Sequence, residues 1–157
     1  MPPTGLPFDD IRALFAIMPP PSQDCVDLVR ERDAMLVKPP GALGRMEELP
    51  QWMAAWQGKS RPTMNRPLVA IFAANHGVVA QGVSSWPQAV TRQMMETFAA
   101  GGGAINQICA TYDLGLKVFD LALDVPTGDI TQGPALDEKG AAATFAFGME
   151  SIAGEID

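Results

Sequence analysis

The feature that most constrains the fold is an uninterrupted apolar run at residues 67–74, Pro67-Leu68-Val69-Ala70-Ile71-Phe72-Ala73-Ala74. Its β-branched and aromatic residues favour a strand, and both faces of that strand must be buried because polar and apolar residues do not alternate. Strands of this kind lie inside parallel sheets that helices cover on both sides. A second strand is predicted over 115–123, which contains Lys117-Val118-Phe119-Asp120-Leu121-Ala122-Leu123.

Helical patterns separate and follow the two predicted strands. Helices are predicted over 85–99, 104–111 and 136–152, and Gly101 suits a left-handed cap at the end of the first. Strands that alternate with helices indicate an α/β fold with a parallel sheet. Two strands are few, since the mean sheet has about 5–6, and the chain ends at 155–157 where a third strand should begin. The sequence therefore looks truncated.

The residues before the first strand are predicted to be helical. Apolar residues at helical spacing predict helices over 8–18, 22–37 and 43–56, with Ser22 as the N-cap of the second and a kink or restart at Pro50 in the third. A polar, proline-bearing link follows at 58–67. We therefore expect an N-terminal helical segment at 1–60 and the first half of an α/β domain at 61–157.

Composition excludes several classes of partner. The chain has 157 residues, of which 47% are hydrophobic and 18% charged, so it is not a disordered polyelectrolyte. A net charge of −7 argues against nucleic acid or an anionic membrane as the main partner. The sequence shows neither a signal peptide nor an apolar stretch long enough for a membrane span, and its two cysteines are too few for a disulfide scaffold. We expect a cytoplasmic protein.

Asn75-His76-Gly77 follows the first predicted strand directly. Ligands of open parallel sheets bind outside the carboxyl ends of the strands, so Asn75 and His76 are candidate ligand contacts, with Gly77 permitting a close approach of backbone. The alternative is a turn in which Asn75 and Gly77 supply unusual dihedral angles and His76 has no role. A single histidine without further ligands at suitable spacing argues against a metal site.

The segment 82–93 leads into the next predicted helix, and its polar residues are further candidates. Ser84 or Ser85 offers a hydroxyl and Gln93 an amide, close to backbone N–H groups at the helix start. The alternative is that Ser85 only caps the helix. Asp120 and Asp124 flank the end of the second strand and could face the same cleft, although we expect them to be solvated loop carboxylates.

Taken together, five blocks of sequence resemble one family, the nicotinate-nucleotide–dimethylbenzimidazole phosphoribosyltransferases of cobalamin nucleotide-loop synthesis. The blocks are Lys38-Pro39-Pro40-Gly41-Ala42-Leu43-Gly44-Arg45-Met46-Glu47, Asn75-His76-Gly77-Val78, Gly82-Val83-Ser84, Val90-Thr91-Arg92-Gln93-Met94 and Gly102-Gly103-Ala104-Ile105-Asn106. The resemblance covers nearly the whole chain, although members of the family are more than twice as long. It therefore implies an N-terminal portion of such an enzyme.

The resemblance also implies a fold and a reaction. The fold is a Rossmann-like large domain with a small helical domain, to which 1–60 would contribute, and the enzymes are homodimers. They transfer phosphoribose from nicotinate mononucleotide to 5,6-dimethylbenzimidazole, which gives α-ribazole 5′-phosphate and nicotinate, and no cofactor or metal is expected. A ring nitrogen of the base attacks the anomeric carbon with inversion while a glutamate near the family's C-terminus removes the azole proton.

Two departures from the family limit what can be carried over. Asn75 stands where the family usually has aspartate, and the general-base glutamate lies beyond residue 157, so no residue here is assigned as catalytic. The predicted substrate-binding residues are Asn75, His76, Gly77, Ser84, Ser85 as the alternative to Ser84, and Gln93. The alternative function is a non-catalytic module that binds an azole or a nucleotide, or a truncated relative of the enzyme.

Overall fold

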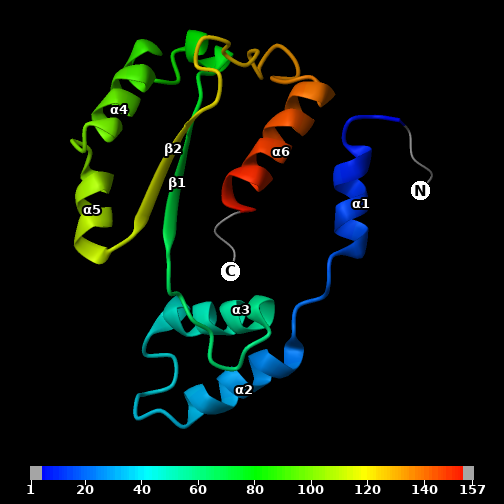
Figure 1. The fold of residues 1–157 in the computed structure, drawn as a ribbon, viewed down its shortest axis with the longest axis vertical. Helices are drawn as coiled ribbons and strands as arrows, with labels where there is room; N and C mark the ends of the chain where they lie inside the picture. The colour runs from blue at the N-terminus through cyan, green and yellow to red at the C-terminus, as the bar shows by residue number, and fades with distance from the viewer. Residues whose placement is uncertain (1–4, 154–157) are drawn as a thin grey trace. The chain divides into compact units, whose positions relative to one another are not determined.

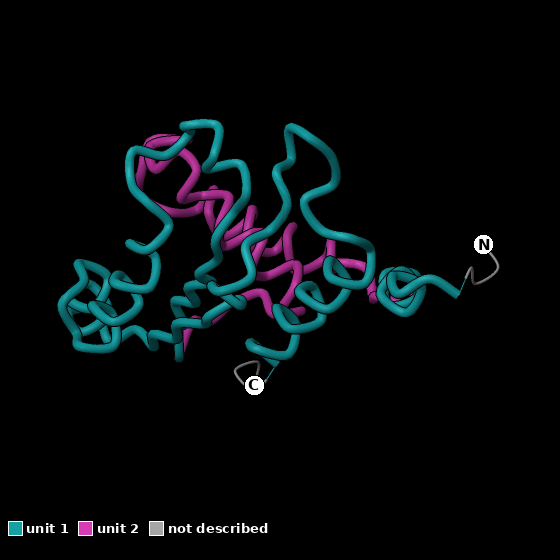
Figure 2. Tube along the Cα trace, turned by 90° about the horizontal axis from the view of Figure 1, so that it is seen from above, with its two compact units in different colours: residues 1–16, 66–157 teal, residues 17–65 magenta. Residues whose placement is uncertain are grey.

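The computed structural model of the chain describes residues 5–153 (Figure 1). The chain forms two compact units, one of residues 17–65 and the other of residues 1–16 and 66–157 (Figure 2). The elements in chain order are α1 (Asp9–Ile17), α2 (Gln23–Ala34), the 3₁₀ helix η1 (Gly44–Glu47), α3 (Glu48–Gln57), β1 (Leu68–Ala73), the 3₁₀ helix η2 (Gly77–Gln81), α4 (Ala89–Ala99), α5 (Ala104–Tyr112), β2 (Gly115–Asp120) and α6 (Glu138–Ala153).

In the unit of residues 17–65, α2 and α3 pack against each other. Ser22 caps α2 as predicted, because its hydroxyl accepts a hydrogen bond from the Cys25 amide at 3.4 Å. Val26, Val29 and the fully buried Ala54 form the small core. The predicted restart near Pro50 is confirmed: α3 begins at Glu48, so proline stands in its first turn, where no backbone donor is needed.

The α/β unit is built on β1 and β2, which pair in parallel from Leu68 opposite Gly115 to Ala73 opposite Asp120. The helices α4 and α5 lie on one side of the sheet and α6 on the other (Figure 1). On the α6 side, the ring of Phe119 stacks on Phe72 at 5.1 Å and meets Phe147 of α6 edge-on at 5.6 Å. The predicted α/β class with a parallel sheet is confirmed.

Several element ends differ from the prediction for local reasons. The strand β2 ends at Asp120 rather than 123, because Ala122 adopts a left-handed φ of 53° and the Asp120 carboxylate accepts from the Leu123 amide at 2.8 Å. The helix α2 ends at Ala34, where the Met35 amide turns back onto the Arg32 carbonyl at 3.1 Å. Gly101 has a φ of +78° just after α4, as predicted.

The helix α1 belongs to the α/β unit. Phe145 of α6 contacts the rings of Phe8 and Phe15 edge-on, at 6.4 and 6.2 Å. The first helix therefore groups with 66–157 and not with the helices that follow it. The expected division of a family domain at residue 60 stays a prediction, and the third strand expected from 155–157 lies outside the described residues.

Neither cysteine is in a disulfide: Cys109 is buried and Cys25 half-buried. Across residues 5–153, no helix combines the length and apolar character that a bilayer crossing requires.

Candidate functional site

Two grooves lie where β1 ends and α4 begins. The first, here called the apolar groove, has a volume of about 470 Å³ and contains no charged side chain. Its lining residues are Ala74, Asn75, His76, Val78, Val79, Val83, Ser84, Trp86, Pro87, Gln88, Val90, Thr91 and Met94. The second, here called the polar groove, has a volume of about 490 Å³ and is lined by Asn75, Gln88, Ala89, Arg92, Gln93, Glu96, Leu123 and Asp124. Asn75 and Gln88 line both grooves, so they form the boundary between them.

Asn75 joins the segment that follows β1 to the segment that follows β2. Its side-chain amide Nδ2 donates to the Leu123 carbonyl at 2.9 Å, and its own carbonyl accepts from the Thr127 amide at 3.0 Å. An ionised aspartate could not make the first of these bonds, since a carboxylate only accepts. Neither Asn75 nor Gly77 has a positive φ, so the alternative of a turn with unusual dihedral angles is wrong.

His76 extends the strand pairing and remains exposed. It forms an isolated parallel bridge with Thr127, and its ring Nδ1 lies 3.3 Å from the Thr127 hydroxyl. Its carbonyl accepts from the Gln88 side-chain amide at 2.8 Å, which ties the end of β1 to the start of α4. In the part of the chain that the structure describes, no group of histidine, cysteine and carboxylate side chains could hold a metal ion.

Gly77 is held against another segment of the chain itself. Its amide donates to the Thr127 carbonyl at 2.9 Å, and a Cβ at this position would lie 2.6 Å from that carbonyl oxygen and 2.8 Å from the Asp129 nitrogen. The close backbone approach expected at Gly77 is therefore made by residues 127–129. Gly77 lines neither groove.

Ser84 and Ser85 have different positions. Ser84 lines the apolar groove, where its hydroxyl donates to the Trp86 carbonyl at 3.0 Å and accepts from the Trp86 amide at 3.2 Å. Ser85 lines neither groove, and the expected helix cap at Ser85 is wrong because α4 begins only at Ala89. The reason is Pro87, which disfavours a helical conformation of the preceding Trp86.

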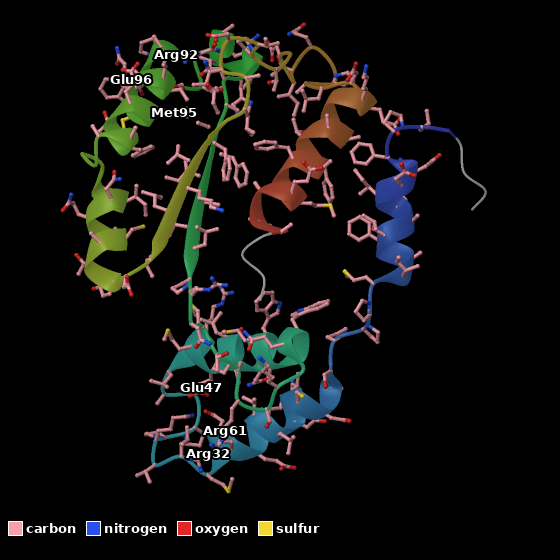
Figure 3. The ribbon with its side chains drawn as sticks, viewed as in Figure 1. Arg32, Glu47, Arg61, Arg92, Met95 and Glu96 are labelled. Carbon is pink, nitrogen blue, oxygen red and sulfur yellow. The ribbon has the colours of Figure 1, made fainter. Side chains whose placement is uncertain are left out.

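Gln93 lines the polar groove, whereas His76 and Ser84 line the apolar groove. Two further residues of the polar groove, Arg92 and Gln88, were not predicted from the sequence. Arg92 pairs with Asp124 at 2.8 Å and with Asp120 at 3.9 Å. The expectation of a solvated carboxylate agrees with the 89% exposure of the Asp124 side chain, but the ion pairs with Arg92 and the place of Asp124 in the polar groove were not predicted. The signal was the spacing of Gln88, Arg92 and Glu96, which places them on one face of a helix, and Figure 3 shows Arg92 and Glu96 on α4.

The carboxylate of Asp129, which lines neither groove, fixes the loop after β2. The Gln81 side-chain amide donates to Asp129 at 2.6 Å, and the Thr131 amide and hydroxyl donate to it at 2.9 and 2.8 Å. These hydrogen bonds lower the pKa of Asp129, and the bond from Gln81 has the largest effect. An ionised Asp129 therefore holds the segment that Gly77 packs against.

Comparison with known proteins gives relatives for this arrangement. A family model described as phosphoribosyltransferase matches residues 18–157. The nicotinate-nucleotide–dimethylbenzimidazole phosphoribosyltransferase of Rhizobium rhizogenes is 65% identical over 154 residues, which cover 98% of this chain and 45% of the relative. That of Sinorhizobium medicae is 64% identical over the same shares. The crystal structure of CobT from Thermus thermophilus matches with a TM-score of 0.71 and 37% identity, over 84% of this chain and 44% of that one. The chain thus spans just under half the length of these relatives.

Proposed function

The chain belongs to the phosphoribosyltransferase family whose model matches residues 18–157, and from that premise we propose that it is the N-terminal portion of a nicotinate-nucleotide–dimethylbenzimidazole phosphoribosyltransferase. The enzyme would move phosphoribose from nicotinate mononucleotide to 5,6-dimethylbenzimidazole in cobalamin synthesis. The observation that carries this proposal is the 65% identity to a relative of that name over nearly the whole chain.

The two grooves suggest how the substrates are divided. The apolar groove holds the flat base, since it has no charged side chain and its volume falls in the usual range of about 300–1,000 Å³ for small-molecule sites. Three of its polar residues, Asn75, His76 and Gln88, receive the ring nitrogens. The attacking nitrogen then points across the boundary formed by Asn75 and Gln88, towards a ribose that reaches the polar groove.

The roles of individual residues follow from this placement. His76 uses Nδ1 towards Thr127, which leaves Nε2 for the base. Gln93 acts from the polar groove, on the ribose side, and Ser84 shapes the mouth of the apolar groove. The general base is a glutamate outside this chain, as the resemblance implies. The same resemblance supports a cytoplasmic homodimer that needs neither metal nor cofactor.

A chimera tests the proposal. This chain replaces the corresponding part of the Rhizobium rhizogenes relative, and α-ribazole 5′-phosphate is measured from nicotinate mononucleotide and dimethylbenzimidazole. We expect product at a rate within about tenfold of the relative's, and about two- to tenfold less with Gln93→Ala, since a lost hydrogen bond costs about 0.5–1.5 kcal/mol. The matched control is Gln107→Ala, an exposed glutamine on α5 that lines neither groove.

The outcomes separate the enzyme from a binding module. A chimera that binds dimethylbenzimidazole in calorimetry but forms no product would favour the non-catalytic module. A chimera that binds neither substrate would contradict the placement of the base. The 157-residue chain by itself should form no product, because it lacks the general base.

A further inference from the structure

We propose that the unit of residues 17–65 has a binding site of its own, which takes a small carboxylate with an apolar body. The inference does not depend on the function proposed above. The site is a pocket of about 210 Å³, here called the helical pocket, and its side chains come from α2, from η1, from α3 and from the loop after α3. Figure 3 shows Arg32, Glu47 and Arg61 in this unit.

Arg32 lines the helical pocket and has no carboxylate to neutralise it. Within the part of the chain that the structure describes, its guanidinium makes no ion pair, whereas Arg12, Arg30 and Arg45 each pair with an acid three residues away. The residues three and four positions from Arg32 are all apolar, so α2 offers no acidic partner. They are Leu28, Val29, Met35 and Leu36.

The two carboxylates that line the helical pocket are already bound to another cation. Asp33 and Glu47 both accept hydrogen bonds from Lys38, at 3.0 and 2.7 Å. Glu47 also accepts from the Leu43 amide at 3.2 Å. The charge of Arg32 is therefore left for a ligand.

The loop after α3 is fixed and places two more basic residues at the edge of the pocket. The Gln57 side chain donates to the Thr63 carbonyl at 2.8 Å and accepts from the Thr63 amide at 3.0 Å, which closes the loop. Ser60 lines the pocket, and Lys59 and Arg61 flank it in the chain. The pocket and its edge thus have more basic than acidic residues, although the chain has a net charge of −7. This local excess of positive charge favours an anion.

The rest of the lining selects the body of the ligand. Its apolar surface comes from Val29, Leu36, Pro50 and Pro62. A bare inorganic anion would leave this surface uncovered, whereas a ring or a short alkyl chain would bury it. The volume lies below the roughly 300 Å³ at which small-molecule sites usually begin, so the ligand is smaller than a nucleotide. Its carboxylate accepts two parallel hydrogen bonds from Arg32 and a third from the Ser60 hydroxyl.

The test uses the whole 157-residue chain and benzoate, with binding measured from backbone amide shifts in NMR titrations. A Kd on the order of 1 mM is expected for so small a ligand, with the largest shifts at Arg32, Ser60 and Arg61. Arg32→Gln should raise this Kd about tenfold, because a hydrogen bond to a charged group is lost. Arg32→Lys should keep part of the affinity, since it keeps the charge and loses the fork. Arg45→Gln is the matched control, because Arg45 is highly exposed and does not line the pocket.

Two further probes separate the two parts of the ligand. Benzamide keeps the ring without the charge, and inorganic phosphate keeps a charge without the ring, so each should bind at least about tenfold more weakly than benzoate. Benzamide that binds as tightly as benzoate, or Arg32→Gln with the parent's affinity and otherwise unchanged amide shifts, would overturn the role of Arg32. Phosphate that binds as tightly as benzoate would overturn the apolar part of the ligand, and benzoate without saturable shifts would overturn the site. Each of these results leaves the proposed function standing, since the chimera tests it separately.

Discussion

The amide nitrogen of the Asn75 side chain gives this position a hydrogen-bond donor that a carboxylate would lack. Asn75 Nδ2 donates to the carbonyl of Leu123, a residue only 3% exposed, and so joins the segment after β1 to the segment after β2. The aspartate that the family resemblance leads one to expect here could make this bond only when protonated. The amide therefore replaces a charge with a donor and leaves the boundary between the two grooves neutral at this point.

Asn75→Asp should destabilise the protein by about 1–3 kcal/mol at pH 7, because a buried carbonyl loses its donor and faces a carboxylate. The loss should shrink below the pKa of the new carboxyl, where the protonated form can donate again. Urea unfolding at pH 7 and at pH 4 measures both effects. Equal losses at the two pH values would contradict the donor role.

Gly77→Ala should cost more than a glycine replacement elsewhere in the loops. A Cβ at 77 would lie 2.6 Å from the Thr127 carbonyl oxygen, so the backbone of 127–129 must move. We expect a loss of about 1–3 kcal/mol in urea unfolding, as for other overpacked sites. Gly133→Ala is the control, since its Cβ would meet nothing within 4 Å and its φ is not positive; a similar loss in both variants would contradict the contact.

At the level of single residues, the sequence predicts which side chains lie near the site better than it predicts which residues they contact. The position of Asn75 and His76 beyond a strand was predictable, because the apolar run ends just before them. The ion pair of Arg92 with Asp124 was not, since it joins side chains 32 residues apart whose contact no local pattern reveals. The division of Ser84 and Gln93 between two grooves was missed for the same reason.

At the scale of elements, interiors were predictable, and ends were predictable only where a local signal such as the Ser22 cap or Gly101 marks them. The apolar runs predicted β1, β2 and their parallel pairing, because burial on both faces leaves few alternatives. The start of α4 was misplaced by four residues, since the hydroxyl of Ser85 fits a cap but Pro87 prevents helix before it. The segment 38–47, which connects α2 to α3, has an ion pair between its first and last residues, Lys38 and Glu47.

That ion pair makes the stability of the helical unit depend on pH. The Lys38 ammonium donates hydrogen bonds to Glu47 at 2.7 Å and to Asp33 at 3.0 Å. The bond between Lys38 and Glu47 lowers the pKa of Glu47 and raises the pKa of Lys38. The contribution of Glu47 is present above its unfolded value near 4.5 and is lost as pH falls through the lowered pKa. The contribution of Lys38 is present below 10.5 and is lost as pH rises through the raised pKa.

Lys38→Met should therefore reduce the loss of stability on acidification from pH 7 to pH 3. In carboxyl NMR titrations, the pKa of Glu47 should rise towards its ordinary value in this variant. Arg45→Met is the control, because its contact with Glu48 is 3.9 Å long and highly exposed. An unchanged Glu47 titration in Lys38→Met would contradict the ion pair.

For the whole molecule, the described residues leave much apolar surface uncovered. None of their large side chains is fully buried, and Phe15 is 59% and Phe145 40% exposed although their rings touch. In the unit of residues 17–65, Met46 is 65% exposed. Such surface is typical of a binding interface.

The chain should therefore bind an apolar fluorescent dye in native buffer. The comparison is CobT from Thermus thermophilus, of which this chain matches 44%, and which should bind less dye per mole. A retained near-ultraviolet circular dichroism signal would separate exposed native surface from a molten state. Dye binding no greater than that of the comparison protein would contradict the expectation.

The rim of the site is joined by main-chain atoms alone at three points: Leu121 to Ala73, Thr127 to Asn75 and Gly77 to Thr127. Such bonds depend on a backbone N–H and not on the side chain beside it. A saturation library over these segments should therefore accept most replacements other than proline at 121, fewer at 127, where the hydroxyl also contacts the His76 ring, and almost none at 77. Side chains that line the two grooves can therefore change while the main-chain bonds that hold the surrounding segments together persist.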